Sequence, residues 1–245
     1  MKFSRLIPLA LSLIATAPLA AQEAPQTASE ITREIASKIG KVSDFTATVE
    51  SGEVVQGEPE SVTASALEVS RLYGWKMTAT GNSPYTIVTD FDTFYQYFPQ
   101  ENRVMKTTAN NPMIKAMLVK PVSDMNPIAL LDPSSVVYKG TEKFEASTVY
   151  HVEGTTESQL MPGGPLVKRT LSAWLSTEDG LPRKTVESVG ISTGTTVYRN
   201  VKINTGLKPE NFRFTPPAGA AVIDTNEQMK KIEQQMRGES PKTED

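Results

Sequence analysis

The sequence predicts a mainly β fold, in which a meandering antiparallel sheet is preceded by one helix and interrupted midway by two more. Apolar side chains alternate with polar ones along most of the chain, as strands with one buried face require. A four-residue apolar repeat occurs near the start, and two Asn-Pro pairs near the middle mark further helix starts.

The first helix is predicted over residues 28–40. Thr27 and Glu30 have the spacing of a capping box, which satisfies free backbone donors at a helix start. Apolar residues recur on one helical face: Ile31, Ile35 and Ile39. This stripe must pack on another element, and the sheet is the expected partner.

The two inserted helices are predicted over residues 111–120 and 126–131, each opened by Asn followed by Pro. Four of the chain's nine methionines lie in or beside this insert: Met105, Met113, Met117 and Met125. Such a surface suits variable apolar partners, although methionines fill gaps in ordinary cores equally well.

The strands are predicted from period-two patterns bounded by turn residues. In order they cover residues 44–50, 62–77, 85–89, 93–98, 103–107, 136–139, 147–153, 167–176, 183–187 and 195–203, with a short extended piece at 212–215.

The strand at 62–77 carries an unusual charge. Arg71 falls in the same register as the apolar residues of this stretch: Leu67, Val69, Tyr73, Trp75 and Met77. A charge on an apolar face is costly unless another group pairs with it. The pattern therefore indicates a cavity that opens, closes and holds an apolar ligand.

Aromatic residues are concentrated between positions 73 and 98: Tyr73, Trp75, Tyr85, Phe94, Tyr95, Tyr97 and Phe98. They form either an ordinary core or the wall of a ligand cavity. The run from Phe94 to Phe98 places aromatics on both faces of one strand, which favours a cover on each face.

The composition limits the chain's class. Residues 1–21 are predicted to be a secretory signal peptide, residues 22–225 a single domain, and residues 226–245 a charged tail, partly helical or disordered. The chain has no cysteine, which excludes disulfides, thiolate sites and a lipid-modified cysteine after the leader. Its net charge of −3 disfavours nucleic-acid binding.

Few residues suggest catalysis. His151 is the only histidine and lies within a strand, where a hydrogen-bonded structural role is more usual than a catalytic one. Asp90 and Asp92 fit a turn rather than a calcium loop. No phosphate-binding loop or nucleophile elbow occurs, so the sequence predicts no enzyme activity, no metal and no cofactor.

Four stretches together resemble the periplasmic outer-membrane lipoprotein carriers, the LolA-like superfamily. They are Lys41–Phe45, Leu72–Met77, Val88–Tyr97 and Phe212–Val222, the last similar to the family's terminal Phe-x-Phe-x-Pro-Pro-x-Gly-x-x-Val. Residues 131–133 and 173–180 also resemble the related mycobacterial glycolipid-binding lipoproteins.

The resemblance implies an incomplete antiparallel β-barrel, or half-barrel, with an N-terminal helix and inserted lid helices. It implies a soluble, monomeric periplasmic carrier or chaperone that binds acyl chains of lipoproteins or related lipids for transfer towards the outer membrane. Its membrane-protein contacts would be transient, with an inner-membrane donor complex and an outer-membrane acceptor. Two alternatives remain open: an envelope-stress sensor or regulator that binds lipid or protein on the same fold, and a glycolipid or quinone-type binder.

The resemblance also suggests which residues form the site. The expected lipid-binding residues are Leu67, Val69, Tyr73, Trp75, Phe94, Met113, Met117 and Leu118. Members of the family close the lid with an arginine at the position of Val69, and Arg71 lies two residues later in the same strand register. We therefore expect Arg71 to donate to backbone carbonyls of the inserted helices near residues 112–131.

Overall fold

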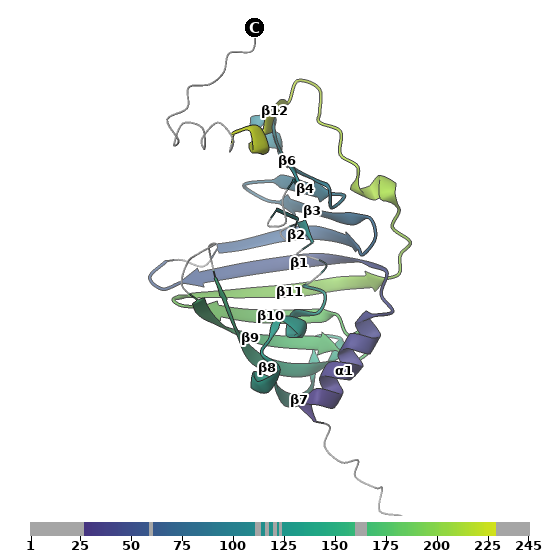
Figure 1. Cartoon of the computed structure of the whole chain (residues 1–245), viewed down its shortest axis with the longest axis vertical. Coiled ribbons are helices and arrows are strands. Elements are labelled where there is room, and N and C mark those ends of the chain that lie inside the picture. The colour runs from purple at the N-terminus through teal and green to yellow at the C-terminus, as the bar shows by residue number, and fades with distance from the viewer. Residues whose placement is uncertain are drawn as a thin grey trace, which may run out of the picture.

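The structure is a computed structural model that describes residues 27–58, 61–110, 114–115, 118–119, 122, 124–159 and 166–228. Twelve strands form one sheet in the order β12-β6-β5-β4-β3-β2-β1-β11-β10-β9-β8-β7 (Figure 1). The two outermost strands do not pair with each other, so the sheet forms the incomplete barrel that was predicted.

The strands are β1 (Asp44–Val55), β2 (Ser61–Ser70), β3 (Gly74–Thr80), β4 (Tyr85–Thr89), β5 (Thr93–Phe98), β6 (Arg103–Thr108), β7 (Val137–Phe144), β8 (Ser147–Gln159), β9 (Leu166–Ser176), β10 (Pro182–Val189), β11 (Ser192–Ile203) and β12 (Ala221–Asp224). The helical elements include α1 (Ala28–Ile39) and four short 3-10 helices, η1 (Pro99–Glu101), η2 (Pro127–Leu130), η3 (Pro133–Ser135) and η4 (Pro209–Phe212). Further helical residues in the described part are 114–115, 118, 122 and 225–228.

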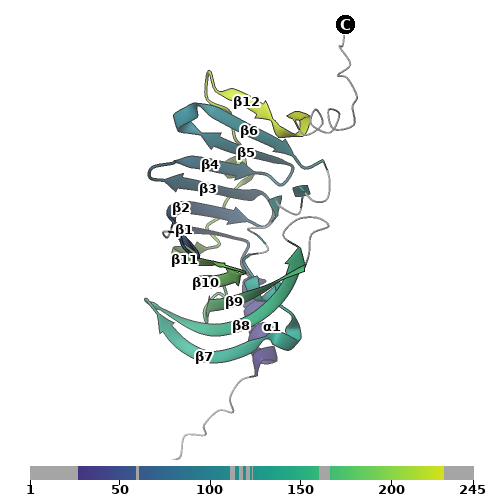
Figure 2. The same ribbon diagram turned by 90° about the vertical axis from the view of Figure 1, so that its left-hand side faces the viewer.

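Two antiparallel meanders make up the sheet. Strands β1 to β6 form one and β7 to β11 form the other, and they join where β1 pairs with β11. The strands β7 and β8 curl strongly at one end of the sheet, which gives that half its concave shape (Figure 2). The core lies between this concave face and the helical elements, and includes Ile31, Phe45, Ile128 and Val152.

Helix α1 follows its sequence signals. Thr27 and Glu30 form the expected capping box, and the isoleucine stripe is buried, with Ile31 and Ile35 at 0% exposure. The helix lies beside the end of the sheet formed by β7, β8 and β9 (Figure 1). The helix therefore closes one side of the half-barrel, and its isoleucine stripe packs on the sheet as predicted.

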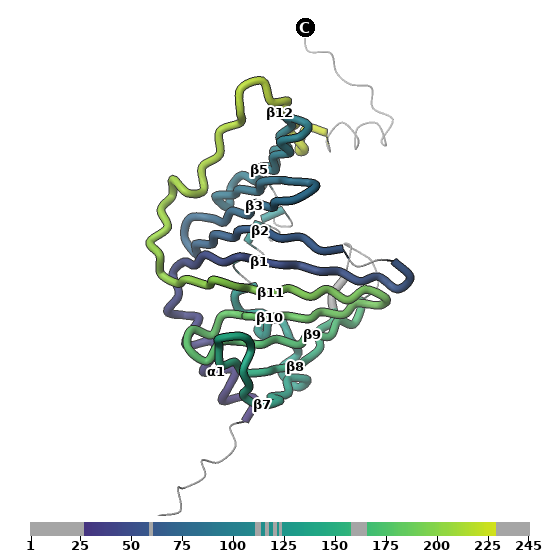
Figure 3. Tube along the Cα trace, turned by 180° about the vertical axis from the view of Figure 1, so that it is seen from behind, coloured from purple at the N-terminus to yellow at the C-terminus, as the bar shows by residue number. Residues whose placement is uncertain are grey.

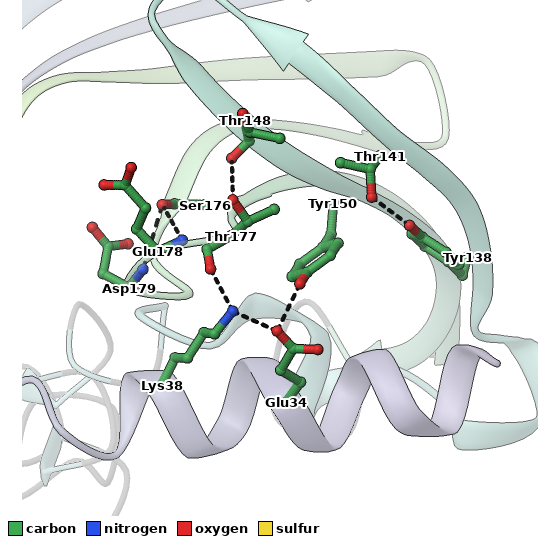
Figure 4. Close-up of polar contacts among 10 residues, drawn as sticks. All are labelled: Glu34, Lys38, Tyr138, Thr141, Thr148, Tyr150, Ser176, Thr177, Glu178 and Asp179. Carbon is green, nitrogen blue, oxygen red and sulfur yellow. Dashed lines mark hydrogen bonds and ion pairs between the residues drawn. The ribbon is translucent and has the colours of Figure 1, made fainter. Parts of the chain in front are cut away.

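A polar network also fixes α1 to the sheet (Figure 4). The Tyr150 hydroxyl donates to Glu34 Oε1 at 2.6 Å, and Lys38 Nζ approaches the same oxygen at 2.5 Å. Lys38 also donates to the carbonyl of Thr177. Burial, and then the bond to Glu34, raise the pKa of Tyr150, so its hydroxyl stays a donor at physiological pH.

The prediction of one continuous strand over residues 62–77 is wrong, because this stretch forms a β-hairpin. β2 ends at Ser70, Arg71 to Tyr73 form the turn, and β3 begins at Gly74. Arg71 therefore lies in a turn, where strand alternation does not set its direction. Gly74 has φ +135°, and a Cβ there would lie 1.9 Å from the carbonyl oxygen of Thr89, so only glycine fits.

The C-terminal part of the described chain forms a strap. After β11 it runs along the sheet to the far end, where β12 pairs in parallel with β6 (Figure 3). Phe212 is buried, and the ring of Phe214 lies 5.3 Å from that of Tyr95. The sequence pattern predicted only an extended piece at 212–215, and β12 was not predicted.

The inserted region agrees in part with its prediction. The expected helix at 126–131 is the short 3-10 helix η2, opened by Asn126 and Pro127 as predicted. Of the helix expected at 111–120, residues 114, 115 and 118 are helical, while Met113 and Met117 lie outside the described residues.

Residues 1–26, which include the predicted leader over 1–21, and residues 229–245, most of the predicted tail, also lie outside the described part, so the domain limits stay predictions. Among the described residues, no helix has both the length and the apolar character needed to cross a membrane.

Candidate functional site: an apolar cavity under a covering segment

The floor of the site is built by cross-strand registers on the concave face. Phe45 of β1 stands opposite Val69 of β2, and Val69 stands opposite Trp75 of β3. Two residues further along, Ala47, Leu67 and Met77 form a second row. Alternation places both rows on one face, so neighbouring strands present a continuous apolar surface.

A cavity of about 240 Å³ lies on this surface. Its wall combines strands from both meanders with the segment that follows β6: Phe45, Val49, Ser51, Leu67, Trp75, Met77, Asp124, Met125, Pro182, Thr196 and Tyr198. The cavity thus lies where β1 and β11 join the two halves of the sheet.

A covering segment, whose described residues are 118–119, 122 and 124–131, forms the roof. Four of its apolar side chains are buried, namely Leu118 at 3% exposure, Met125 at 2%, Ile128 at 2% and Leu131 at 5%, whereas Leu130 is exposed. Immediately after the segment, Asp132 N donates to Thr155 O at 2.8 Å, which fixes its C-terminal end to β8.

Trp75 connects floor and roof. Its indole Nε1 donates to the carbonyl oxygen of Leu118 at 2.6 Å, in a buried hydrogen bond. Phe94 packs edge-on against the indole ring, with the ring centroids 6.1 Å apart. A buried donor without an acceptor is costly, so this bond favours the covered state.

One end of the cavity is more polar. Tyr198 lines it together with Asp124, Ser51 and Thr196. Burial, and then the negative charge of Asp124, raise the pKa of Tyr198, so its hydroxyl remains protonated at physiological pH.

A second hollow, of about 350 Å³, lies between α1 and the covering segment; we call it the rim hollow. It is lined by Ala36, Ile39, Gly40, Arg71, Val122, Met125, Asn126, Ala129 and Leu130. Met125 lines both spaces, so they adjoin. Within the described part of the chain, Asn126 Oδ1 is buried and has no hydrogen-bond partner.

Arg71 lies at the rim hollow, and its partner differs from the expected one. Its Nη2 donates to the carbonyl of Ile39 at 2.8 Å, at the end of α1. The expected acceptors were carbonyls near residues 112–131. The bond from floor to roof belongs to Trp75 instead, and Arg71 ties the β2–β3 turn to α1.

The expected lipid-binding residues occupy different places. Leu67 and Trp75 line the cavity, and Leu118 lies in the roof. Val69 is fully buried within the floor, Phe94 packs beside Trp75, and Tyr73 lies in the turn with 38% exposure, outside the lining. Met113 and Met117 lie outside the described residues. The lipid-binding role of this set stays a prediction.

Sequence reasoning missed most of the cavity wall. Phe45 and Val49 lie on the correctly predicted strand at 44–50, so their alternation was a usable signal. Tyr198 and Thr196 reach the cavity only because β11 pairs with β1, which no local pattern reveals.

His151 packs by stacking rather than by hydrogen bonding. Its ring stacks on Trp174 with the centroids 4.3 Å apart, and Glu153 Oε1 lies 3.4 Å from its Nε2, which makes no hydrogen bond within the described part of the chain. Asp90 accepts from the backbone of Thr93 at 2.8 Å, as a turn residue does. Within the described ranges, no three His, Cys, Asp or Glu residues form a group that could hold a metal ion.

No protein-family model and no curated protein matches the chain. An uncharacterized conserved protein from Thermus thermophilus is similar in structure, with 15% identity and a TM-score of 0.49 over 81% of this chain and 99% of that one. The lipoprotein LppX from Mycobacterium tuberculosis has 13% identity and a TM-score of 0.47 over 73% and 95% of the two chains.

A LolA superfamily protein from Nitrosomonas europaea is also similar, with 9% identity and a TM-score of 0.42, over 78% of this chain and 99% of that one. The similar structures therefore include a protein of the LolA superfamily and a mycobacterial lipoprotein.

Proposed function

We propose that this protein is a periplasmic carrier that binds acyl chains of lipoproteins or related lipids on the concave face of its half-barrel. The observation that supports it most is the apolar cavity beneath a covering segment that is itself held mainly by apolar side chains. The sequence resemblance supports the same class. Export, monomeric state, and a donor and acceptor at the two membranes are parts of this proposal.

The size of the cavity requires the cover to move. Pockets for drug-sized ligands usually measure about 300–1,000 Å³, and this cavity measures about 240 Å³. A whole acyl chain therefore fits only if it takes the place of the roof. Met125, which lines the cavity from the roof, is the side chain in the best position to be exchanged for methylene groups of the ligand.

This exchange makes release feasible. Burying a chain of roughly 15 carbons is worth up to about 12 kcal/mol. Uncovering four buried side chains of the roof costs about 1.5–3 kcal/mol each, or of the order of 6–12 kcal/mol together. The two terms oppose each other, so the net affinity stays low enough for cargo to be handed on.

A native mass measurement of the purified mature protein, residues 22–245, tests the proposal. We expect adducts with the mass of acylated molecules, which organic extraction removes. A clean apo mass, together with no uptake of added acyl lipid, would contradict the carrier role and favour a protein-binding regulator.

A filled cavity gives the sharper test. Thr196→Phe places a ring in the cavity wall, and Thr195→Phe places the same ring on the opposite face of β11. We expect Thr196→Phe to lower acyl-lipid binding by at least about tenfold, because the ring occupies ligand volume. Thr195→Phe should bind as the parent does. Equal binding by both variants would place the ligand elsewhere.

A further inference from the structure

We infer that Trp75 recognises the carbonyl group of an acyl ester or amide, which names the ligand class for the proposed carrier and rests on that proposal. In the covered state the indole N–H donates to Leu118 O at 2.6 Å, and both residues are buried, at 6% and 3% exposure. A ligand that displaces the roof removes this acceptor.

The floor around Trp75 is mostly apolar. On the β2 side Val69 lies directly opposite and Phe45 is next in the row. On the β4 side its partner is Thr89, whose hydroxyl oxygen already accepts from the backbone N–H of Phe91 at 3.0 Å. Ser51, at the polar end of the cavity, lies six residues from Phe45 along β1, roughly 20 Å away. Asp124 belongs to the roof and leaves with it.

A ligand that supplies its own acceptor avoids an unpaired buried donor. The carbonyl oxygen of an ester or amide is a strong acceptor, whereas a hydrocarbon has none and an alkyl ether oxygen is weaker. Leaving a buried N–H unsatisfied typically weakens binding by roughly 5- to 100-fold. The floor therefore favours acyl esters and amides over alkyl chains of equal length.

The two hollows suggest how such a ligand lies. With its carbonyl at Trp75, the hydrocarbon tail follows the cavity towards Tyr198, and the head lies on the side of the rim hollow that Ile39 and Arg71 form. This orientation suits glycerol esters and N-acylated peptides.

The test uses a matched lipid pair, monodecanoylglycerol and its ether analogue monodecylglycerol, on the delipidated mature chain. The parent should bind the ester about 5- to 50-fold more tightly by calorimetry. Trp75→Phe, which keeps an aromatic ring but has no donor, should bind both within about twofold. Trp174→Phe, which changes the outer-face tryptophan bonded to Glu142, should keep the parent's preference.

The outcomes separate the two proposals. If the parent binds neither lipid, the carrier function itself is wrong. If it binds both equally, or if Trp75→Phe keeps the preference, only carbonyl recognition is overturned.

An isotope-edited infrared spectrum covers the case in which Trp75→Phe does not fold. The ¹³C ester carbonyl band of lipid bound to the parent should lie lower than in dry alkane, as hydrogen bonding requires. An alkane-like frequency would overturn the inference.

Discussion

Single side chains decide how the rim of the half-barrel is held. Arg71 joins the β2–β3 turn to the last carbonyl of α1, and it does so beside the rim hollow. A cation bonded to a helix C-terminus also interacts favourably with the helix dipole. This bond stabilises the empty arrangement, so a ligand head entering the rim hollow must disturb it.

Replacement of Arg71 by leucine should therefore lengthen cargo retention. Loss of the bond to Ile39 removes a stabilisation specific to the empty state, and we expect about a 3- to 10-fold slower transfer of bound acyl lipid to acceptor vesicles. Arg71→Lys keeps a charged donor, so its transfer rate should lie between the rates of the parent and of Arg71→Leu. Transfer at the parent's rate by Arg71→Leu would rule out this role for Arg71.

Gly74 sets the close approach of β3 to the end of β4. Gly74→Ala meets both a positive φ and a backbone oxygen at 1.9 Å, and should lower the free energy of unfolding by about 2–4 kcal/mol in urea titrations. Gly81→Ala is the matched control, because Gly81 has φ +109° and no atom within 4 Å of a new Cβ. Its cost should be only about 1–2 kcal/mol.

At the scale of elements, a buried carboxylate attaches β1 to the strap. Asp44 has 5% exposure, and its Oδ1 accepts from Thr205 N at 2.6 Å and Thr205 Oγ1 at 2.7 Å. Burial alone would raise the pKa of Asp44, but the bonds from Thr205 and Ser43 outweigh it and lower the pKa. The charged form thus contributes stability in the folded state.

This contribution should depend on pH in a defined direction. A carboxyl with a lowered folded pKa stabilises fully above its unfolded pKa, near 3.9, and loses that effect as pH falls through the folded value. We expect Asp44→Asn to be less stable than the parent by about 1–3 kcal/mol at pH 7. This difference in the free energy of unfolding between the parent and Asp44→Asn should become smaller below about pH 4. If the difference in the free energy of unfolding stays constant down to about pH 3, ionisation of Asp44 does not contribute to stability.

Elements were predictable from the sequence wherever their signals are local. The capping box and isoleucine stripe of α1 lie within thirteen consecutive residues, and the helix follows them. The turn at Arg71–Tyr73 was missed because its residues are apolar or long, and the glycine that permits it comes only at position 74. β12 was missed because its pairing with β6 depends on a strap more than a hundred residues later in the chain.

At the scale of the whole molecule, the candidate site exists because distant segments meet. The β1–β11 pairing joins the two meanders, and the segment after β6 returns across their junction to form the roof. The resemblance to the carrier family predicted the half-barrel and a lid. The hydrogen bond that Trp75 donates to the roof could not be predicted from the sequence, because its acceptor is the backbone carbonyl of Leu118, forty-three residues away.

The proposed movement of the roof can be blocked covalently. Gly154 of β8 lies beneath Leu131, and a Cβ built on Gly154 would be 3.4 Å from the Cβ of Leu131. That separation is close to disulfide geometry, and the chain has no other cysteine to compete. The double variant Leu131→Cys/Gly154→Cys should therefore form one bond between roof and sheet.

When oxidised, this variant should take up acyl lipid at least about tenfold more slowly than when reduced, because the roof must leave as a unit for the chain to enter. Stopped-flow fluorescence of Trp75, in a Trp174→Phe background, measures the rate directly. The reduced form and the single variant Leu131→Cys serve as controls for the substitutions. Equal rates in both redox states would mean that lipid enters without displacement of the roof at Leu131, and that a different part of the half-barrel opens.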